Sequence, residues 1–199
     1  MKKIKIVFAI VVLSFFSCSK DDETGAVIEP YKSAAFQAVS NTSEPIIDST
    51  VPDVPGVTTS NIFVSTTGSI KDYKKVSLEM YVSHAYGRDL EFILVTPDNT
   101  EKTFVFRIGT GKAYDQTQKL EFNALYTSVL TESGDFIPQG KYKESKGVNY
   151  ASAVLQPIFS FLQDKNINGI WKLKIKDHGV GDIGMLVSWK LQFAEDALN

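Results

Sequence analysis

Two histidines are the residues of this chain that could serve as a catalytic base. They are His84 and His178. A Ser-His-Asp hydrolase needs such a base within hydrogen-bond reach of a nucleophile, with a carboxylate orienting it. Ser83 precedes His84 directly, but neighbouring residues of a strand point to opposite faces, so Ser83 is a poor partner. We therefore expect no catalytic residue. His84 should hydrogen-bond within the fold, and His178 should be exposed in a turn.

Three aspartates, Asp89, Asp177 and Asp182, form the second candidate group. They lie in segments rich in turn-forming residues, where backbone carbonyls are also free. Calcium takes six to eight oxygen ligands from carboxylates, carbonyls and water. The turn from Asp177 to Asp182 could therefore bind Ca²⁺, with Asp89 as a further ligand. The alternative is that these aspartates only cap turns through the backbone.

The elements that must position these residues are clearest in the segment 169–193. It contains two runs in which apolar and polar residues alternate, as in strands with one buried and one wet face. Between the runs, residues 177–184 include three glycines and two aspartates and predict a turn. We expect two core strands with both tryptophans buried. The apolar residues are Trp171, Leu173 and Ile175, then Val187, Trp189, Leu191 and Phe193.

Upstream, short apolar or alternating runs are separated by proline, glycine and asparagine, which is typical of an all-β protein. No long helix and no repeat is visible. The expected strands lie at 60–65, 76–82, 90–95, 103–108 and 120–122.

The first 18 residues predict a lipoprotein signal peptide. Three lysines precede an apolar run at 6–16, which is short for a membrane span. Ser17 and Cys18 follow and resemble a bacterial lipobox, which implies cleavage before Cys18 and acylation of its thiol. Two or more acyl chains anchor a protein stably, since each buried CH₂ contributes about 0.8 kcal/mol.

The acidic run at 19–23 resembles the surface-export signal of lipoproteins in Bacteroidota-like Gram-negative bacteria. We thus expect an outer-membrane, surface-exposed lipoprotein. The expected organisation is a signal peptide at 1–17, a lipidated cysteine and flexible linker at 18–45, a β-sandwich at 46–194 and a tail at 195–199.

Charge and cysteine content exclude several classes of protein. The chain has 21 basic and 23 acidic residues, and removal of the three lysines in the signal peptide leaves 18 against 23, a net charge of −5. No concentrated basic face is visible, so we expect no nucleic-acid partner. The single cysteine excludes an internal disulfide and a cysteine-based zinc site.

Five segments, in order, carry a resemblance to a known family. They are residues 82–90 (VSHAYGRDL), 94–100 (LVTPDNT), 136–142 (FIPQGKY), 155–161 followed by 169–173, and 177–193. They resemble the P domain (P/Homo B domain), which follows the subtilisin-like catalytic domain of proprotein convertases. Here Gly87 and Arg88 stand in exchanged order relative to the family pattern. Asn99 replaces a glycine, and asparagine tolerates the left-handed conformation that glycine allows there.

The resemblance implies a galactose-binding-like jelly-roll β-sandwich of about eight strands. Such a domain packs against a protease and carries no catalytic residue itself. The chain has no room for a subtilisin-like domain, which needs roughly 250 residues. We expect a non-catalytic binding or accessory module. Its partner would be a secreted or envelope protein, or, in the alternative, a serine-type endopeptidase with which the domain works in trans.

Overall fold

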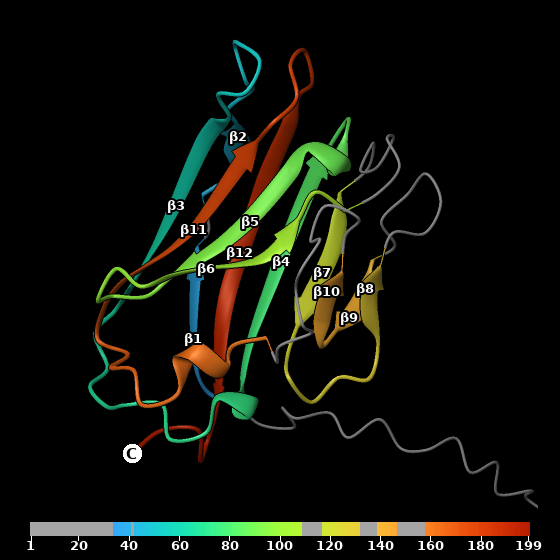
Figure 1. Cartoon of the computed structure of the whole chain (residues 1–199). Helices are drawn as coiled ribbons and strands as arrows, with labels where there is room; N and C mark the ends of the chain where they lie inside the picture. Colours follow the sequence, from blue (N-terminus) through green and yellow to red (C-terminus); the bar gives the residue numbers. More distant parts are fainter. Residues whose placement is uncertain (1–33, 41, 109–116, 132–138, 147–157) are drawn as a thin grey trace, which may run out of the picture.

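Two β-sheets packed face to face form the body of the protein. The computed structural model describes residues 34–40, 42–108, 117–131, 139–146 and 158–199 (Figure 1). Within them a six-stranded and a four-stranded sheet make a sandwich, and a two-stranded ribbon lies beside it. The predicted all-β sandwich is confirmed.

Eight strands have five or more residues, and four have three. The longer strands are β1 (Ala34–Ser40), β3 (Gly56–Val64), β4 (Val76–His84), β5 (Leu90–Val95), β6 (Glu101–Phe106), β7 (Gln118–Phe122), β11 (Gly169–Asp177) and β12 (Gly184–Ala194). The three-residue strands are β2 (Glu44–Ile46), β8 (Val129–Thr131), β9 (Gly140–Tyr142) and β10 (Glu144–Lys146).

The larger sheet has the order β1-β12-β4-β7-β9, with β2 also paired to β12, and the smaller sheet has the order β3-β11-β5-β6. The ribbon pairs β10 with β8. The pairs β7–β9 and β8–β10 are parallel, and the other strand pairs are antiparallel.

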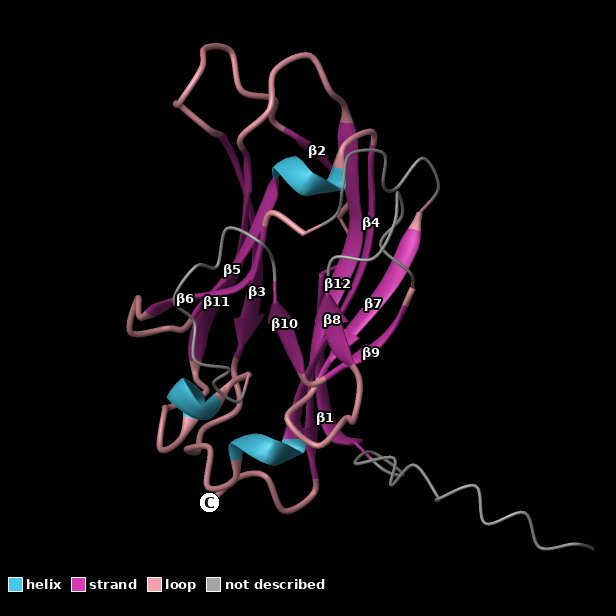
Figure 2. Ribbon diagram, turned by 45° about the vertical axis from the view of Figure 1, so that its right-hand side comes forward, coloured by secondary structure: helices cyan, strands magenta, loops and turns pink. Residues whose placement is uncertain are grey.

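The helices of these ranges are three short 3-10 turns, η1 (Tyr73–Lys75), η2 (Gly87–Asp89) and η3 (Ser160–Leu162), drawn in cyan in Figure 2. Within the described ranges, no helix combines the length and the apolar character that crossing a membrane requires.

The two strands of the segment 169–193 do not pair with each other. β11 lies inside the four-stranded sheet between β3 and β5, whereas β12 lies inside the six-stranded sheet between β1 and β4. The turn between them crosses from one sheet to the other. Both strands are therefore central, and each contributes its apolar face to the same core.

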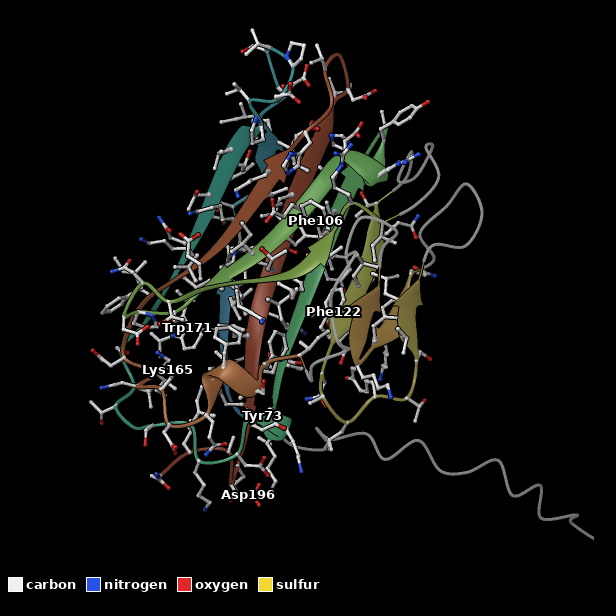
Figure 3. The ribbon with its side chains drawn as sticks, viewed as in Figure 1. Tyr73, Phe106, Phe122, Lys165, Trp171 and Asp196 are labelled. Atoms are coloured by element: carbon white, nitrogen blue, oxygen red, sulfur yellow. The ribbon has the colours of Figure 1, made fainter. Side chains whose placement is uncertain are left out.

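Both tryptophans are buried in that core, as predicted. Trp171 of β11, labelled in Figure 3, makes a T-shaped contact with Phe193 of β12. The ring centroids lie 6.3 Å apart, and the contact joins the two sheets. The Nε1 of Trp171 donates a hydrogen bond to the carbonyl of Ile167 at 2.8 Å. Truncating a buried tryptophan to alanine typically destabilises a protein by about 3–5 kcal/mol.

The opposite face of β11 carries Lys172, Lys174 and Lys176 outward. Lys174 pairs with Glu101 on β6, and Lys176 lies 3.4 Å from Glu91 on β5. This is the wet face that the alternation predicts.

Two expected boundaries differ from the structure. Residues 34–40, expected in the linker, form β1 and pair with β12. The expected tail is also part of the fold, since Ala197 is fully buried and Asn199 donates its backbone N–H to Ser69. The run 34–40 is short and three of its seven residues are alanine, which is depleted in strands, so its strand depends on the free edge of β12 to satisfy its backbone groups. Cys18 and the rest of 1–33 lie outside the described residues.

Candidate functional site

Three loops gather at one end of the sandwich, the upper end in Figure 1. They are residues 47–55 between β2 and β3, residues 85–89 between β4 and β5, and residues 178–183 between β11 and β12. Hydrogen bonds join them. Gly181 donates its backbone N–H to Asp48 at 2.8 Å, and Ala85 donates to the carbonyl of Ile183 at 3.0 Å. We call this region the three-loop end.

A buried histidine–aspartate pair lies beneath the loops. His84 is the last residue of β4, Asp177 is the last residue of β11, and both side chains are fully buried. His84 Nε2 donates to Asp177 Oδ2 at 3.0 Å, because a carboxylate accepts. The other carboxylate oxygen accepts the backbone N–H of Gly179 at 3.0 Å.

The second ring nitrogen of His84 is also engaged. Nδ1 lies 2.9 Å from the carbonyl oxygen of Tyr86 and 3.1 Å from its backbone nitrogen. Both ring nitrogens therefore have partners within the fold, and the ring is closed off from solvent. The prediction that His84 hydrogen-bonds within the sandwich is confirmed.

Burial raises the pKa of the Asp177 carboxyl. The N–H of Gly179 and the His84 ring act in the opposite direction, and the carboxylate of Asp48 adds to the increase. Burial likewise raises the pKa of Asp182, with Asp89 and Asp48 adding to it and His84 opposing it. Negative charge is thus disfavoured inside this end mainly because burial removes these carboxyl groups from water, and to a smaller extent because neighbouring carboxylates repel it.

His178 is half-buried rather than exposed, which corrects the expectation for it. Its Nε2 lies 3.1 Å from Glu91 Oε2, and its ring makes a T-shaped contact with the ring of Phe106, with centroids 5.9 Å apart. Phe106 is labelled in Figure 3. The ring lies over β5 and β6 because the backbone N–H of His178 is bonded to the carbonyl of Asp89.

The three predicted calcium ligands do come to the same end. Asp89 ends η2 and faces Arg107 at 3.5 Å, Asp177 is held by His84, and Asp182 lies in the last loop. Among the described residues, no three or more His, Cys, Asp or Glu side chains are placed to hold a metal ion. The described side chains thus form no ready cluster for a metal ion, and the calcium hypothesis from the sequence stays untested by the structure.

Sequence reasoning missed Asp48 and Glu91. Asp48 follows β2 closely, and its Oδ2 holds the glycine turn while its Oδ1 is buried without a hydrogen-bond partner in the described part of the chain. Glu91 is buried on β5 and accepts from Thr103 at 2.8 Å as well as contacting His178. A carboxylate in a strand or directly after it carries no local signal of such partners.

Two glycines let the last loop fit closely against the other two. A Cβ at Gly184 would lie 2.2 Å from His84 Cδ2 and 2.7 Å from the carbonyl oxygen of Ser83. A Cβ at Gly179 would lie 2.3 Å from an Asp89 carboxylate oxygen. The glycine-rich turn is therefore required by packing against His84 and Asp89.

These features define a class of protein: a β-sandwich whose polar side chains at one end form hydrogen bonds that hold the loops together. The residues 73–193 match the model of the proprotein convertase P-domain, and the chain belongs to this family. Within the matched region, Asn99 stands where the family pattern has glycine, and it takes a left-handed φ of 61°.

Two solved structures of an Aeromonas sobria serine protease resemble the chain. In its complex with the chaperone ORF2, the identity is 13%, the TM-score is 0.36, and the match covers 82% of this chain and 28% of that chain. For the protease without the chaperone, the identity is 12% and the TM-score is 0.35, and the match covers 79% of this chain and 27% of that chain. The chain thus spans less than a third of the length of these proteins. A comparison with curated proteins finds no match.

Proposed function

We propose that this protein is a non-catalytic P-domain lipoprotein that binds a protein partner at the surface of the outer membrane. Its membership of the P-domain family carries the proposal, since the matched region spans most of the sandwich. In proprotein convertases this domain accompanies the catalytic domain and supplies no catalytic residue. The partner that family membership favours is a subtilisin-like serine protease, encoded separately and bound in trans.

The burial and the partners of the two histidine rings support a non-catalytic role. His84 is buried with both ring nitrogens engaged, so it has no nitrogen left to accept a proton from a nucleophile. His178 is turned toward Glu91 and Phe106. A general base must come within hydrogen-bond reach of the proton that it removes. We expect the purified, folded chain to show no protease or esterase activity, and measurable activity would overturn this part of the proposal.

The lipid anchor is proposed on Cys18, because it follows an apolar run of signal-peptide length. In Bacteroidota-like Gram-negative cells, labelled palmitate should be incorporated into the wild-type chain and not into the Cys18→Ala variant. Equal labelling of both would contradict the anchor. Digestion of intact cells with an added protease would then separate an extracellular domain, which is degraded, from a periplasmic one, which is protected.

A pull-down of the anchored chain from envelope extracts tests the partner. Recovery of a subtilisin-like protease would support action in trans. Recovery of another envelope protein would keep the binding module and reject the protease as its partner. A chain that consistently comes down alone would contradict the proposed function.

A further inference from the structure

The three-loop end exposes an unusual share of the apolar surface. Of the twelve large hydrophobic residues that are exposed in the described part of the chain, six lie in these loops. Ile183 is the most exposed of them, at 82%. The six are Ile47, Val51, Val54, Tyr86, Val180 and Ile183.

The three loops adjoin one another, so these side chains share one end of the molecule. On β12, Gly184 pairs with Ile46 of β2 on one side and with His84 of β4 on the other. Ile183, which precedes Gly184, therefore lies between residues 47 and 85, where the other two loops begin. The hydrogen bond from Ala85 to the carbonyl of Ile183 fixes this order. A cluster of exposed apolar residues on a folded domain marks an interaction site more often than scattered ones do.

The loops are held in place before any partner arrives. The His84–Asp177 pair, the bond from Gly181 to Asp48 and the close fit of Gly184 against His84 join them from below. Binding to such a surface loses little loop entropy, which favours affinity.

The charge around the apolar residues indicates the chemistry of the partner. Among the charged side chains of the three loops that are at least partly exposed, together with Arg107, four aspartates and two arginines leave an excess of two negative charges, and the buried Asp177 lies beneath them. The charged residues are Asp48, Asp53, Asp89 and Asp182, with Arg88 and Arg107. A second copy of the chain would bring like charges together, and an anionic membrane would be repelled. A protein surface with an aliphatic centre and a basic rim would be complementary.

The direction of the chain places this end away from the proposed anchor. Ala34, where the described chain begins, pairs with Ala194 at the end of β12, whereas the three loops lie at Gly184, where β12 begins. β12 has eleven residues, so roughly 33 Å separate the two ends at about 3.3 Å per residue. Figure 1 shows the loops at the upper end and the C-terminus at the lower end.

We propose that the three-loop end is the docking surface for the protein partner, and that the partner presents an aliphatic patch flanked by lysine or arginine. This inference rests on the proposed function, since it names the surface and the chemistry through which the module binds.

Site-specific photo-crosslinking in cells of the source type tests it on the full, acylated chain. Benzoylphenylalanine is placed at Ile183, and in a matched variant at Phe63, which is 70% exposed on the outer face of β3. Mass spectrometry then identifies the crosslinked peptide. We expect an adduct at position 183 and not at 63, to a peptide with lysine or arginine beside aliphatic residues.

Charge substitution gives the second measurement. Ile183→Asp and Val180→Asp should each lower recovery of the crosslinked partner at least tenfold, and Phe63→Asp should leave recovery unchanged. All three positions are exposed, so the variants should fold, which equal thermal midpoints would show. Raising salt to about 0.5 M should also weaken recovery, because exposed charge pairs are screened.

The other outcomes separate the two proposals. A partner recovered equally by all three variants, or crosslinked equally from position 63, overturns the docking surface and leaves the proposed function standing. An adduct at position 183 to a second copy also overturns the docking surface. The docking surface is also overturned if the unacylated Cys18→Ala chain floats with phosphatidylethanolamine–phosphatidylglycerol vesicles and this flotation is lost when Ile183→Asp is added. A chain that recovers and crosslinks no protein overturns the proposed function itself.

Discussion

His84 Nε2 and Asp177 Oδ2 lie 3.0 Å apart although the two residues are separated by 93 positions in the chain. His84 ends a strand of the six-stranded sheet, and Asp177 ends a strand of the four-stranded sheet. The pair is thus a polar connection between the two layers, directly below the three loops. Because both side chains are fully buried, neither can exchange its partner for water.

Removing either member of this pair should destabilise the domain strongly. In His84→Ala the buried carboxylate loses its partner, and in Asp177→Ala the ring loses its acceptor. Loss of one member of a buried pair typically lowers the free energy of unfolding by about 3–5 kcal/mol. Urea unfolding of the purified chain measures this. Glu101→Ala, which removes an exposed partner of Lys174, should lower it by about 1 kcal/mol or less. Equal losses in all three variants would contradict the special role of the pair.

Gly184→Ala should destabilise the domain through a clash. The new Cβ would lie 2.2 Å from the His84 ring and 2.7 Å from a backbone oxygen, which cannot move aside cheaply. Overpacking of this kind costs about 1–3 kcal/mol, which corresponds to a fall of several degrees in the thermal midpoint. Val187→Ala on the same strand, at an exposed position, should change the midpoint little. An unchanged midpoint in Gly184→Ala would show that the loops are not packed as described.

Stability should fall on acidification, in part through Glu79. Burial by itself raises the pKa of this carboxyl, but hydrogen bonds and charge from Lys119 and Lys190 outweigh burial and lower it below its ordinary value. The pKa of Glu91 is lowered in the same way, against burial, by Thr103, His178 and Lys176.

A carboxyl whose pKa is lower in the folded state stabilises the fold above its unfolded value, near 4.5. That contribution is lost as the pH falls through the lower folded value. Thermal midpoints measured from pH 7 down to pH 3 should therefore fall below about pH 4.5. In Glu79→Gln the midpoint should be lower at pH 7 and should fall less on acidification. A variant with the same profile as the wild type would argue against this assignment.

Calcium gives a fourth measurement. Asp177 has both oxygens engaged by His84 and Gly179, so it could ligate an ion only by giving up one of them. We expect equal thermal midpoints in millimolar calcium and in chelator. A ligand that binds the native state alone must raise the midpoint. A rise with calcium that disappears in Asp182→Asn would therefore establish the site that the sequence suggests.

Much of the fold could be predicted because it depends on local alternation. The runs around Trp171 and Trp189 have period two, so the burial of one face of each follows from strand geometry. The glycine-rich turn between them was visible for the same reason. The expectation of burial is wrong for Val187, which is exposed where the register of β12 against β4 shifts between Leu186 and Ser188. β1 could not be predicted, since three of its seven residues are alanine, which favours strands little, and the strand is ordered by the edge of β12.

The sequence by itself determined the class of fold, the core faces of the strands and the family, because those depend on patterns within short segments. Tertiary structure alone decided that β11 and β12 lie in opposite sheets and that His84 meets Asp177. It also decided that the loops 47–55, 85–89 and 178–183 expose their apolar residues at one end. Such relationships arise from strand order and layer packing, which link distant segments. No local pattern of residue types encodes which strand ends will meet.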